Sequence, residues 1–157
     1  MPGTVEIGVI SDTHGLLRPG AIEALRGVST ILHAGDVGGA EILAGLAALA
    51  PVHAVRGNTD GGAWGRTLPL TDLFTIAGVT LGMHHGHFEP EFDFRAAGAT
   101  VVISGHSHRP LIETRNGILY LNPGSAGPRR FDLPVTVARL TLRDGVAEAR
   151  IVPVALS

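Results

Sequence analysis

The sequence predicts an α/β fold in which two mixed β-sheets pack as a sandwich with flanking helices. In the first third of the chain, short strands alternate with helical segments, which is typical of βαβ units and a parallel sheet. In the last third, strands follow one another directly, and Asp144-Gly145 is a strong hairpin signal. This change from βαβ units to consecutive strands leads us to expect two sheets packed face to face.

The first half of the chain predicts three strands and two helices. The expected strands are residues 5–10, 31–34 and 52–55, and the expected helices are residues 20–26 and 40–50. The strands are rich in Val, Ile and Leu and are bounded by Gly or polar residues. The second helix is rich in Ala and Leu and stops at Pro51, which cannot continue it.

The second half predicts mainly strands. They are expected at residues 73–77, 80–84, 100–104, 118–121, 135–142 and 146–154, with a short helix at residues 91–97. The first two strands form a hairpin that turns at Gly78, and the last two form a hairpin at Asp144-Gly145. No repeat, linker or low-complexity segment interrupts the series.

Length and composition limit the classes of protein. With 157 residues and 45% apolar content, residues 1–157 are expected to form a single domain. The net charge is -2, and the arginines are scattered except for Arg129 and Arg130, which argues against binding to extended nucleic acid. The N-terminus has no charged leader pattern, and the longest run of apolar residues and glycine, residues 42–50, is shorter than the ~20 residues of a membrane span. We expect a cytoplasmic protein without a membrane partner.

Five apolar runs stop at residues that can bind a metal. These residues are Asp12 and His14, Asp36, Asn58, His85, and His106 with His108. Because open α/β sheets bind their ligands beyond the carboxyl ends of the strands, we expect these side chains to form one site. The chain contains no Cys, so the ligands must be nitrogen or oxygen atoms.

The ligand set predicts chemistry on phosphate. Two divalent ions held by two carboxylates and neutral ligands keep about two positive charges, which attract anions. In a two-metal site a bridging water is acidified towards hydroxide, and the ions clamp the phosphoryl oxygens during an in-line displacement. Mixed nitrogen and oxygen ligands suit Mn, Fe, Co, Ni or Zn better than Mg or Ca. The ligand set does not choose among these metals; we take Mn as the first candidate.

The ordered motifs resemble those of a known family. Asp-x-His, Gly-Asp, Gly-Asn, His-Gly-His and Gly-His-x-His follow one another at strand ends as in the calcineurin-like metallophosphoesterases, specifically the small prokaryotic phosphodiesterase group without a cap domain. The resemblance covers residues ~5 to 125. The segment Asn122-Pro123-Gly124-Ser125 also resembles a signature of this group. The resemblance implies two-metal hydrolysis of phosphodiester bonds in small substrates, such as cyclic nucleotides or activated diesters.

The resemblance also assigns roles to the residues. It places Asp12, His14 and His108 on one metal ion and Asn58, His85 and His106 on the other, with Asp36 bridging them. The family's ligand is the His directly before Gly, which is His85; His84 is then expected to pack at the strand end.

The expected catalytic residues are Asn58 and His87. Many family members carry a His directly after the Asn, where it helps to protonate the leaving group, but this chain has Thr59. His87 is the candidate substitute, and substrates with good leaving groups are expected.

Several other residues have two interpretations. His33 and His53 are expected to be packing residues, and His33 is the better candidate for supporting the ligands. Asp60 either orients a metal-bound His or caps a turn. Trp64 is expected to anchor its loop rather than to stack on a nucleobase, and Arg129-Arg130 to be an exposed pair rather than a phosphate contact.

Three alternative functions remain open at this stage. The first is a phosphomonoesterase. The second is a nuclease, which needs an extended basic track that the sequence lacks. The third is a non-catalytic scaffold like a retromer subunit that resembles this fold and has an impaired metal site, whereas here all seven positions carry competent residues. The expected partner is a small phosphodiester, and the sequence leaves open whether the chain forms a homo-oligomer.

Overall fold

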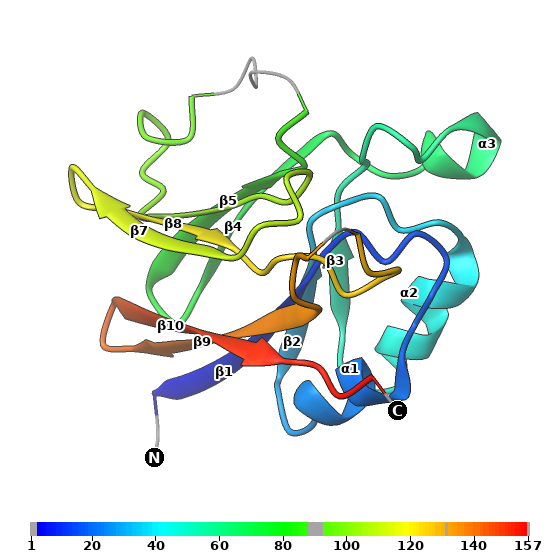
Figure 1. Ribbon diagram of the computed structural model, residues 1–157. Helices are drawn as coiled ribbons and strands as arrows, with labels where there is room; N and C mark the ends of the chain where they lie inside the picture. The colour runs from blue at the N-terminus through cyan, green and yellow to red at the C-terminus, as the bar shows by residue number, and fades with distance from the viewer. Residues whose placement is uncertain (1–2, 88–92, 131, 157) are drawn as a thin grey trace.

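Two five-stranded sheets form the framework of the protein in the computed structural model, which describes residues 3–87, 93–130 and 132–156 (Figure 1). The first sheet has the spatial order β10 (Val146–Pro153), β9 (Thr136–Arg143), β1 (Thr4–Ile10), β2 (Thr30–His33) and β3 (Val52–Ala54). The second has the order β4 (Thr71–Ile76), β5 (Val79–His84), β6 (Val101–Ile103), β8 (Ile118–Asn122) and β7 (Leu111–Arg115).

Both sheets are mixed, which confirms the predicted fold class. In the first sheet β1, β2 and β3 are parallel, while β9 runs antiparallel to both β1 and β10. In the second sheet β5, β6 and β8 are parallel, and the antiparallel strands β4 and β7 form the edges. The three parallel strands of each sheet therefore direct the loops that follow them to one end of that sheet.

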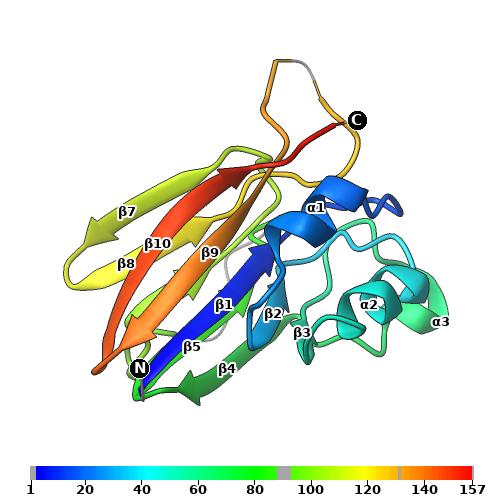
Figure 2. The same cartoon turned by 90° about the horizontal axis from the view of Figure 1, so that it is seen from below.

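The predicted outer helices are present on one side of the sandwich. Helices α1 (Pro19–Ala24) and α2 (Ala40–Ala47) cover the outer face of the first sheet (Figure 2). A buried apolar cluster that includes Leu25, Ile31 and Leu46 joins them to this sheet. Both helices end two or three residues earlier than predicted, at Ala24 and Ala47. After α2 the Leu49 amide donates a hydrogen bond to the Leu46 carbonyl oxygen, and the chain forms a tight turn there. In the part of the chain that the structure describes, no helix is long and apolar enough to cross a membrane.

The main core lies between the two sheets. Ile7 and Val9 of β1, Leu81 of β5, and Leu140 and Leu142 of β9 belong to one buried cluster. Alternate residues of these strands point into this layer, as expected for strands with one face buried. Packing of the two inner faces holds the strand ends of one sheet against those of the other.

The sequence prediction was wrong at three places. The described part of the expected helix at 91–97, residues 93–97, is not helical: a turn spans residues 94–98, and Phe94 packs against Val102 and Ile118. Residues 91 and 92 lie outside the described residues. Strand β7 was missed because all its side chains are exposed and show no apolar alternation. The following Asn116-Gly117 turn, with both φ angles positive, was the available signal. The short helix α3 (Gly62–Gly65) was also missed. The other predicted strands are present, with ends within two residues of those predicted.

Candidate metal centre

The seven predicted ligands lie just beyond the carboxyl ends of five strands. Asp12 and His14 follow β1, Asp36 follows β2, Asn58 follows β3, His85 follows β5, and His106 and His108 follow β6. The first sheet thus contributes four of these side chains and the second sheet three. The candidate site lies where the two sheets meet, and it depends on their packing.

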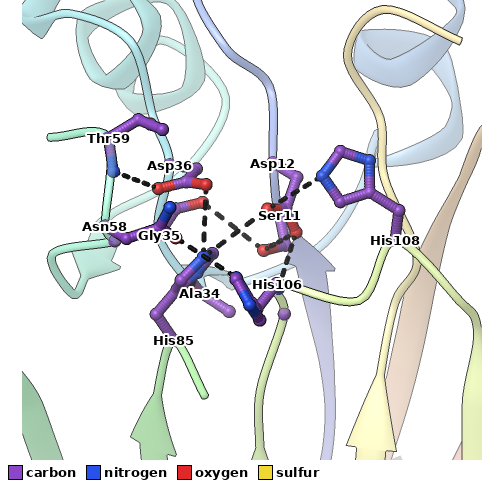
Figure 3. A network of polar contacts seen from close by, with 12 residues as sticks. Ser11, Asp12, Ala34, Gly35, Asp36, Asn58, Thr59, His85, His106 and His108 are labelled. Carbon is purple, nitrogen blue, oxygen red and sulfur yellow. Dashed lines mark hydrogen bonds and ion pairs between the residues drawn. The ribbon is translucent and has the colours of Figure 1, made fainter. Parts of the chain in front are cut away.

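Two carboxylates occupy the centre of this group. Asp12 Oδ1 lies 3.9 Å from His14 Nε2, 3.7 Å from His85 Nε2 and 3.4 Å from His108 Nε2. Asp36 Oδ2 lies 3.2 Å from His85 Nε2 (Figure 3). The same oxygen lies 3.7 Å from His14 Nε2. Two sets of ligand atoms, one from Asp12, His14 and His108 and one from Asp12, Asp36 and His85, each lie within 4.8 Å of one another.

Several of the ligand atoms are buried without a hydrogen-bond partner, as expected for atoms that bind a cation. Asp12 Oδ1, His14 Nε2 and His85 Nε2 are buried and have no hydrogen-bond partner within the described residues. A buried polar atom without a partner costs about 1–3 kcal/mol, and most such atoms in native proteins have one. Divalent metal ions that accept nitrogen and carboxylate ligands would satisfy these atoms, with His14 and His85 in separate ligand groups that share Asp12.

The protein positions each carboxylate with one oxygen and leaves the other facing the site. Asp12 Oδ2 accepts hydrogen bonds from Ser11 Oγ at 2.7 Å and from the His106 amide at 3.1 Å, which leaves Oδ1 for the site. Asp36 Oδ1 accepts a hydrogen bond from the Thr59 amide at 2.9 Å, which leaves Oδ2. The sequence analysis considered only the side chain of Thr59 and missed this role of its backbone.

The orientation of His85 is also determined by the protein. Its Nδ1 lies 2.8 Å from the carbonyl oxygen of Ala34, and because a carbonyl only accepts, Nδ1 carries the proton. The lone pair of neutral His85 is then on Nε2, which faces Asp12 and Asp36. Metal-binding histidines commonly donate their second nitrogen in this way.

Five of the predicted ligands have an unusual backbone conformation. Asp12, His14, Asp36, His106 and His108 all have positive φ angles, between 47° and 71°. The other non-glycine residues with positive φ in the described ranges, Ala77, Asn116 and Asp144, lie in hairpin turns. Left-handed conformations in non-glycine residues are uncommon and cluster at functional sites, where the surrounding structure holds them. This independent backbone signal marks the same residues as the sequence motifs.

Two glycines allow the loops to approach. A Cβ atom on Gly57 would lie 2.1 Å from Asp36 Oδ1, and one on Gly35 would lie 2.7 Å from His85 Nδ1. A side chain at either position would displace a predicted ligand. The Gly-Asp and Gly-Asn motifs therefore need their glycines for space.

Burial and charge shift the pKa values of the central groups. Burial raises the pKa of Asp12, and this effect exceeds the opposing influence of His85. Burial would also raise the pKa of Asp36, but His85 and the Thr59 amide hold it well below the usual range. Burial would lower the pKa of His85, yet the carboxylates of Asp36 and Asp12 raise it. Asp36 and His85 thus each favour the charged form of the other, and a metal ion at Nε2 of His85 would compete with a proton there.

The remaining predicted site residues lie on the open side. Asn58 and His106 are exposed, and His106 Nδ1 lies 3.2 Å from Asn58 Oδ1. The ring of His87 is centred 5.4 Å from that of His85 and 6.3 Å from that of His106. Burial, with the charges of His85 and His106, lowers the pKa of His87. The structure therefore places the partly exposed His87 beside the histidines of the site.

Asp60 and Asn122 hold the loops that carry predicted ligands. The buried carboxylate of Asp60 accepts amide hydrogen bonds from Val37, Gly38 and Gly57, which favours the turn-capping interpretation. Asn122 Nδ2 donates to the Gly105 carbonyl oxygen at 2.9 Å and to Ser107 Oγ at 3.2 Å. The Asn122-Pro123-Gly124-Ser125 motif alone does not indicate this role of Asn122, because its partners lie 15 and 17 residues earlier in the chain.

The other side chains with two interpretations either pack against neighbouring residues or lie on the surface. Trp64 is partly buried against the cluster beneath α2, which favours its role as an anchor. His53 is not in the interior; it is half-exposed and stacks on Phe74 at 4.8 Å, across the edges of the two sheets. His84 packs against Phe94, and Arg129 and Arg130 are exposed.

Comparison with known proteins identifies the family. The sequence profile of the calcineurin-like phosphoesterase superfamily domain matches residues 5–145. The chain belongs to this superfamily. A curated protein of Methanothermobacter thermautotrophicus named as a probable metallophosphoesterase is 42% identical over 147 residues, which span 85% of each chain.

Solved structures of other proteins share the fold. An archaeal phosphodiesterase is 25% identical, with a TM-score of 0.76 over 94% of this chain and 99% of the other. Vps29 from Entamoeba histolytica in complex with Zn²⁺ is 26% identical, with a TM-score of 0.71 over 94% of this chain and 98% of the other. Family membership and the ligand geometry together make the protein a metal-dependent phosphoesterase that uses divalent metal ions.

Proposed function

We propose that this phosphoesterase uses two divalent metal ions to hydrolyse phosphodiester bonds in small substrates. The observation that carries the proposal is the pair of ligand groups that share Asp12, with Asp36 facing both His14 and His85. One ion of ordinary coordination number cannot use all seven candidate side chains. Mn²⁺ is the first candidate, and Fe, Zn, Co and Ni are compatible with the same donors.

In this proposal each metal position has its own histidines. Asp12, His14 and His108 hold one ion, Asn58, His85 and His106 hold the other, and Asp36 serves both. When bound, the ions supply an acidified water as the nucleophile and positive charge for the phosphoryl oxygens. The buried side of the site belongs to Asp12, Asp36 and His85, so substrate approaches from the exposed side.

The residues on the exposed side decide the class of substrate. Thr59 contacts Asp36 through its backbone and offers no group that can protonate a leaving group at neutral pH. The lowered pKa of His87 keeps its imidazole largely neutral at that pH, so it acts as a hydrogen-bond donor to the substrate rather than as a strong acid. Substrates that need little protonation of the leaving group are therefore favoured, such as nitrophenyl diesters and the strained rings of 2′,3′-cyclic nucleotides.

A panel of three substrates tests the proposal. With Mn²⁺ present, we expect kcat/KM to be higher for bis(p-nitrophenyl) phosphate and for a 2′,3′-cyclic nucleotide than for an alkyl monophosphate. Elemental analysis of the reconstituted protein is expected to approach two metal ions per chain. A clear preference for the alkyl monophosphate makes the protein a phosphomonoesterase, and full activity with one ion removes the two-metal mechanism.

The same panel addresses the other functions. A nuclease is expected to degrade a long single-stranded oligonucleotide faster than a cyclic nucleotide. A scaffold is expected to bind metal without turnover of any substrate. The candidate ligands are complete in this chain, which supports an enzyme over a scaffold.

A further inference from the structure

His33 differs from the histidines that face the candidate metal centre. It is fully buried at the end of β2, and both of its ring nitrogens have partners in the protein. Nδ1 accepts the amide hydrogen bond of Gly35 at 3.1 Å, and Nε2 lies 2.9 Å from Thr13 Oγ1. Because its nitrogens are occupied in this way, His33 is not a ligand itself.

The directions of these hydrogen bonds follow from their acceptors. Thr13 Oγ1 lies 2.7 Å from the carbonyl oxygen of Val37, which can only accept, so the Thr13 hydroxyl donates there. The same hydroxyl then accepts from His33, whose proton is on Nε2, and Nδ1 is free to accept from Gly35. Burial lowers the pKa of His33 to about 3, so the neutral tautomer persists through the physiological range.

The chain of hydrogen bonds joins two ligand loops. Thr13 lies between Asp12 and His14, while Gly35 and Val37 flank Asp36. His33 and these three residues, Thr13, Gly35 and Val37, are all buried. The neighbouring ligands Asp12, His14 and Asp36 have positive φ angles. Backbone hydrogen bonds from Asp12 to Gly35 and from His14 to Asp36 run beside the side-chain link.

We propose that His33 is a positioning residue that holds the Asp12–His14 loop against the Gly35–Val37 loop through Thr13, and thereby sets the distance between the ligands of the two metal positions. The proposal rests on the proposed two-metal function. It assigns to His33 and Thr13 no contact with metal or substrate.

A double-mutant cycle isolates the link. In His33→Asn the side-chain oxygen can still accept from the Gly35 amide, as in an Asx turn, but it is too short to reach Thr13. Thr13→Val removes the same link from the other side with little change of volume, together with the hydrogen bond to the Val37 carbonyl oxygen, and Thr13→Ser keeps the hydroxyl. The controls are His53→Asn on the surface of β3 and Thr80→Val on β5, whose hydroxyl contacts Thr75.

The readout is metal affinity, measured by calorimetric titration of the metal-free proteins with Mn²⁺ and by the absorption spectrum of bound Co²⁺. We expect His33→Asn and Thr13→Val each to weaken Mn²⁺ binding about 10-fold, the lower end for residues that support ligands. The double variant is expected to match Thr13→Val, because that substitution already removes the link to His33. Thr13→Ser and both controls are expected to keep wild-type affinity and the wild-type Co²⁺ spectrum.

The outcomes separate this inference from the proposed function. Wild-type affinity in folded His33→Asn and Thr13→Val, or fully additive losses in the double variant, overturns the positioning role. If His33→Asn does not fold, the contrast between Thr13→Val and Thr13→Ser decides the question. Failure of the wild-type protein to bind two ions instead contradicts the proposed function.

Discussion

His85 Nδ1 donates a hydrogen bond to the carbonyl oxygen of Ala34 over 2.8 Å, and these two residues follow strands of different sheets. The bond orients an imidazole from the second sheet by a backbone group of the first. It also shows that the candidate site is a product of sheet packing, because Asp36, two residues after Ala34, reaches the same imidazole. Changes that shift the sheets relative to one another are therefore expected to affect metal binding before they unfold the protein.

Asp36→Asn is expected to be among the most damaging single substitutions. It removes one of two anionic ligands and weakens the group that faces both His14 and His85. We expect kcat/KM for bis(p-nitrophenyl) phosphate to fall at least about 100-fold and the bound metal to decrease, as measured by elemental analysis. His53→Ala, on the exposed surface, is expected to keep both. The reverse pattern contradicts the assigned roles.

Gly57→Ala tests the close approach of two loops. The new Cβ atom would lie 2.1 Å from Asp36 Oδ1 and 2.3 Å from the Asp36 amide nitrogen, so either Asp36 or the loop must move. We expect loss of activity of at least about 10-fold and weaker metal binding, comparable to the loss of a group that supports a ligand. Gly61→Ala is the matched control in the same loop, because a Cβ atom there meets nothing within 4 Å. Equal activity of the two variants shows that the approach is not needed.

Asn122→Asp tests the support of the loop that carries His106 and His108. The substitution keeps the shape of the side chain but replaces the amide donor to the Gly105 carbonyl with an acceptor. We expect a loss of about 1–3 kcal/mol in the free energy of unfolding, measured with urea, and weaker Mn²⁺ binding. Asn116→Asp in the exposed β7–β8 turn is the control. An unchanged Mn²⁺ affinity in Asn122→Asp means that this loop keeps its conformation without the amide.

The buried His33 predicts a pH dependence of stability in the metal-free protein. Its folded-state pKa of about 3 lies below the value of 6.5 for an exposed histidine, so the unfolded state binds the extra proton between these values. Stability therefore falls as the pH decreases from 6.5 towards 3, with a slope of up to about 1.4 kcal/mol per pH unit from this group. Urea unfolding of wild type and His33→Asn between pH 7.5 and 4.5 measures the difference. We expect a shallower slope in the variant, and equal slopes contradict a neutral buried His33.

Much of the fold was predictable because its signals are local. Each strand that is buried on at least one face shows its apolar residues within a few positions, and the Asp144-Gly145 hairpin is encoded by adjacent residues. Strand β7 was not recognised because its exposed residues carry no such pattern. The prediction of a helix at 91–97 was wrong in the part that the structure describes. Phe94 packs there against Val102 of β6 and Ile118 of β8 instead of lying on a helix face.

The sequence by itself determined which side chains follow the strand ends, and thus the chemical types available to the site. It also determined the residues for which left-handed conformations are tolerated, since Asp and His adopt them more readily than branched side chains do. These properties depend on the identity and the order of neighbouring residues.

Only the tertiary structure decided which of these groups meet and what holds them. The pairing of β9 with β1, the hydrogen bond from His85 to Ala34 and the link from His33 to Thr13 join residues far apart in the chain. Their formation depends on how the two sheets and their loops pack, and no local pattern encodes it. For this reason the donor set was visible in the sequence, whereas the hydrogen-bond partners of His33, Asp60 and Asn122 could be seen only once the strands were brought together.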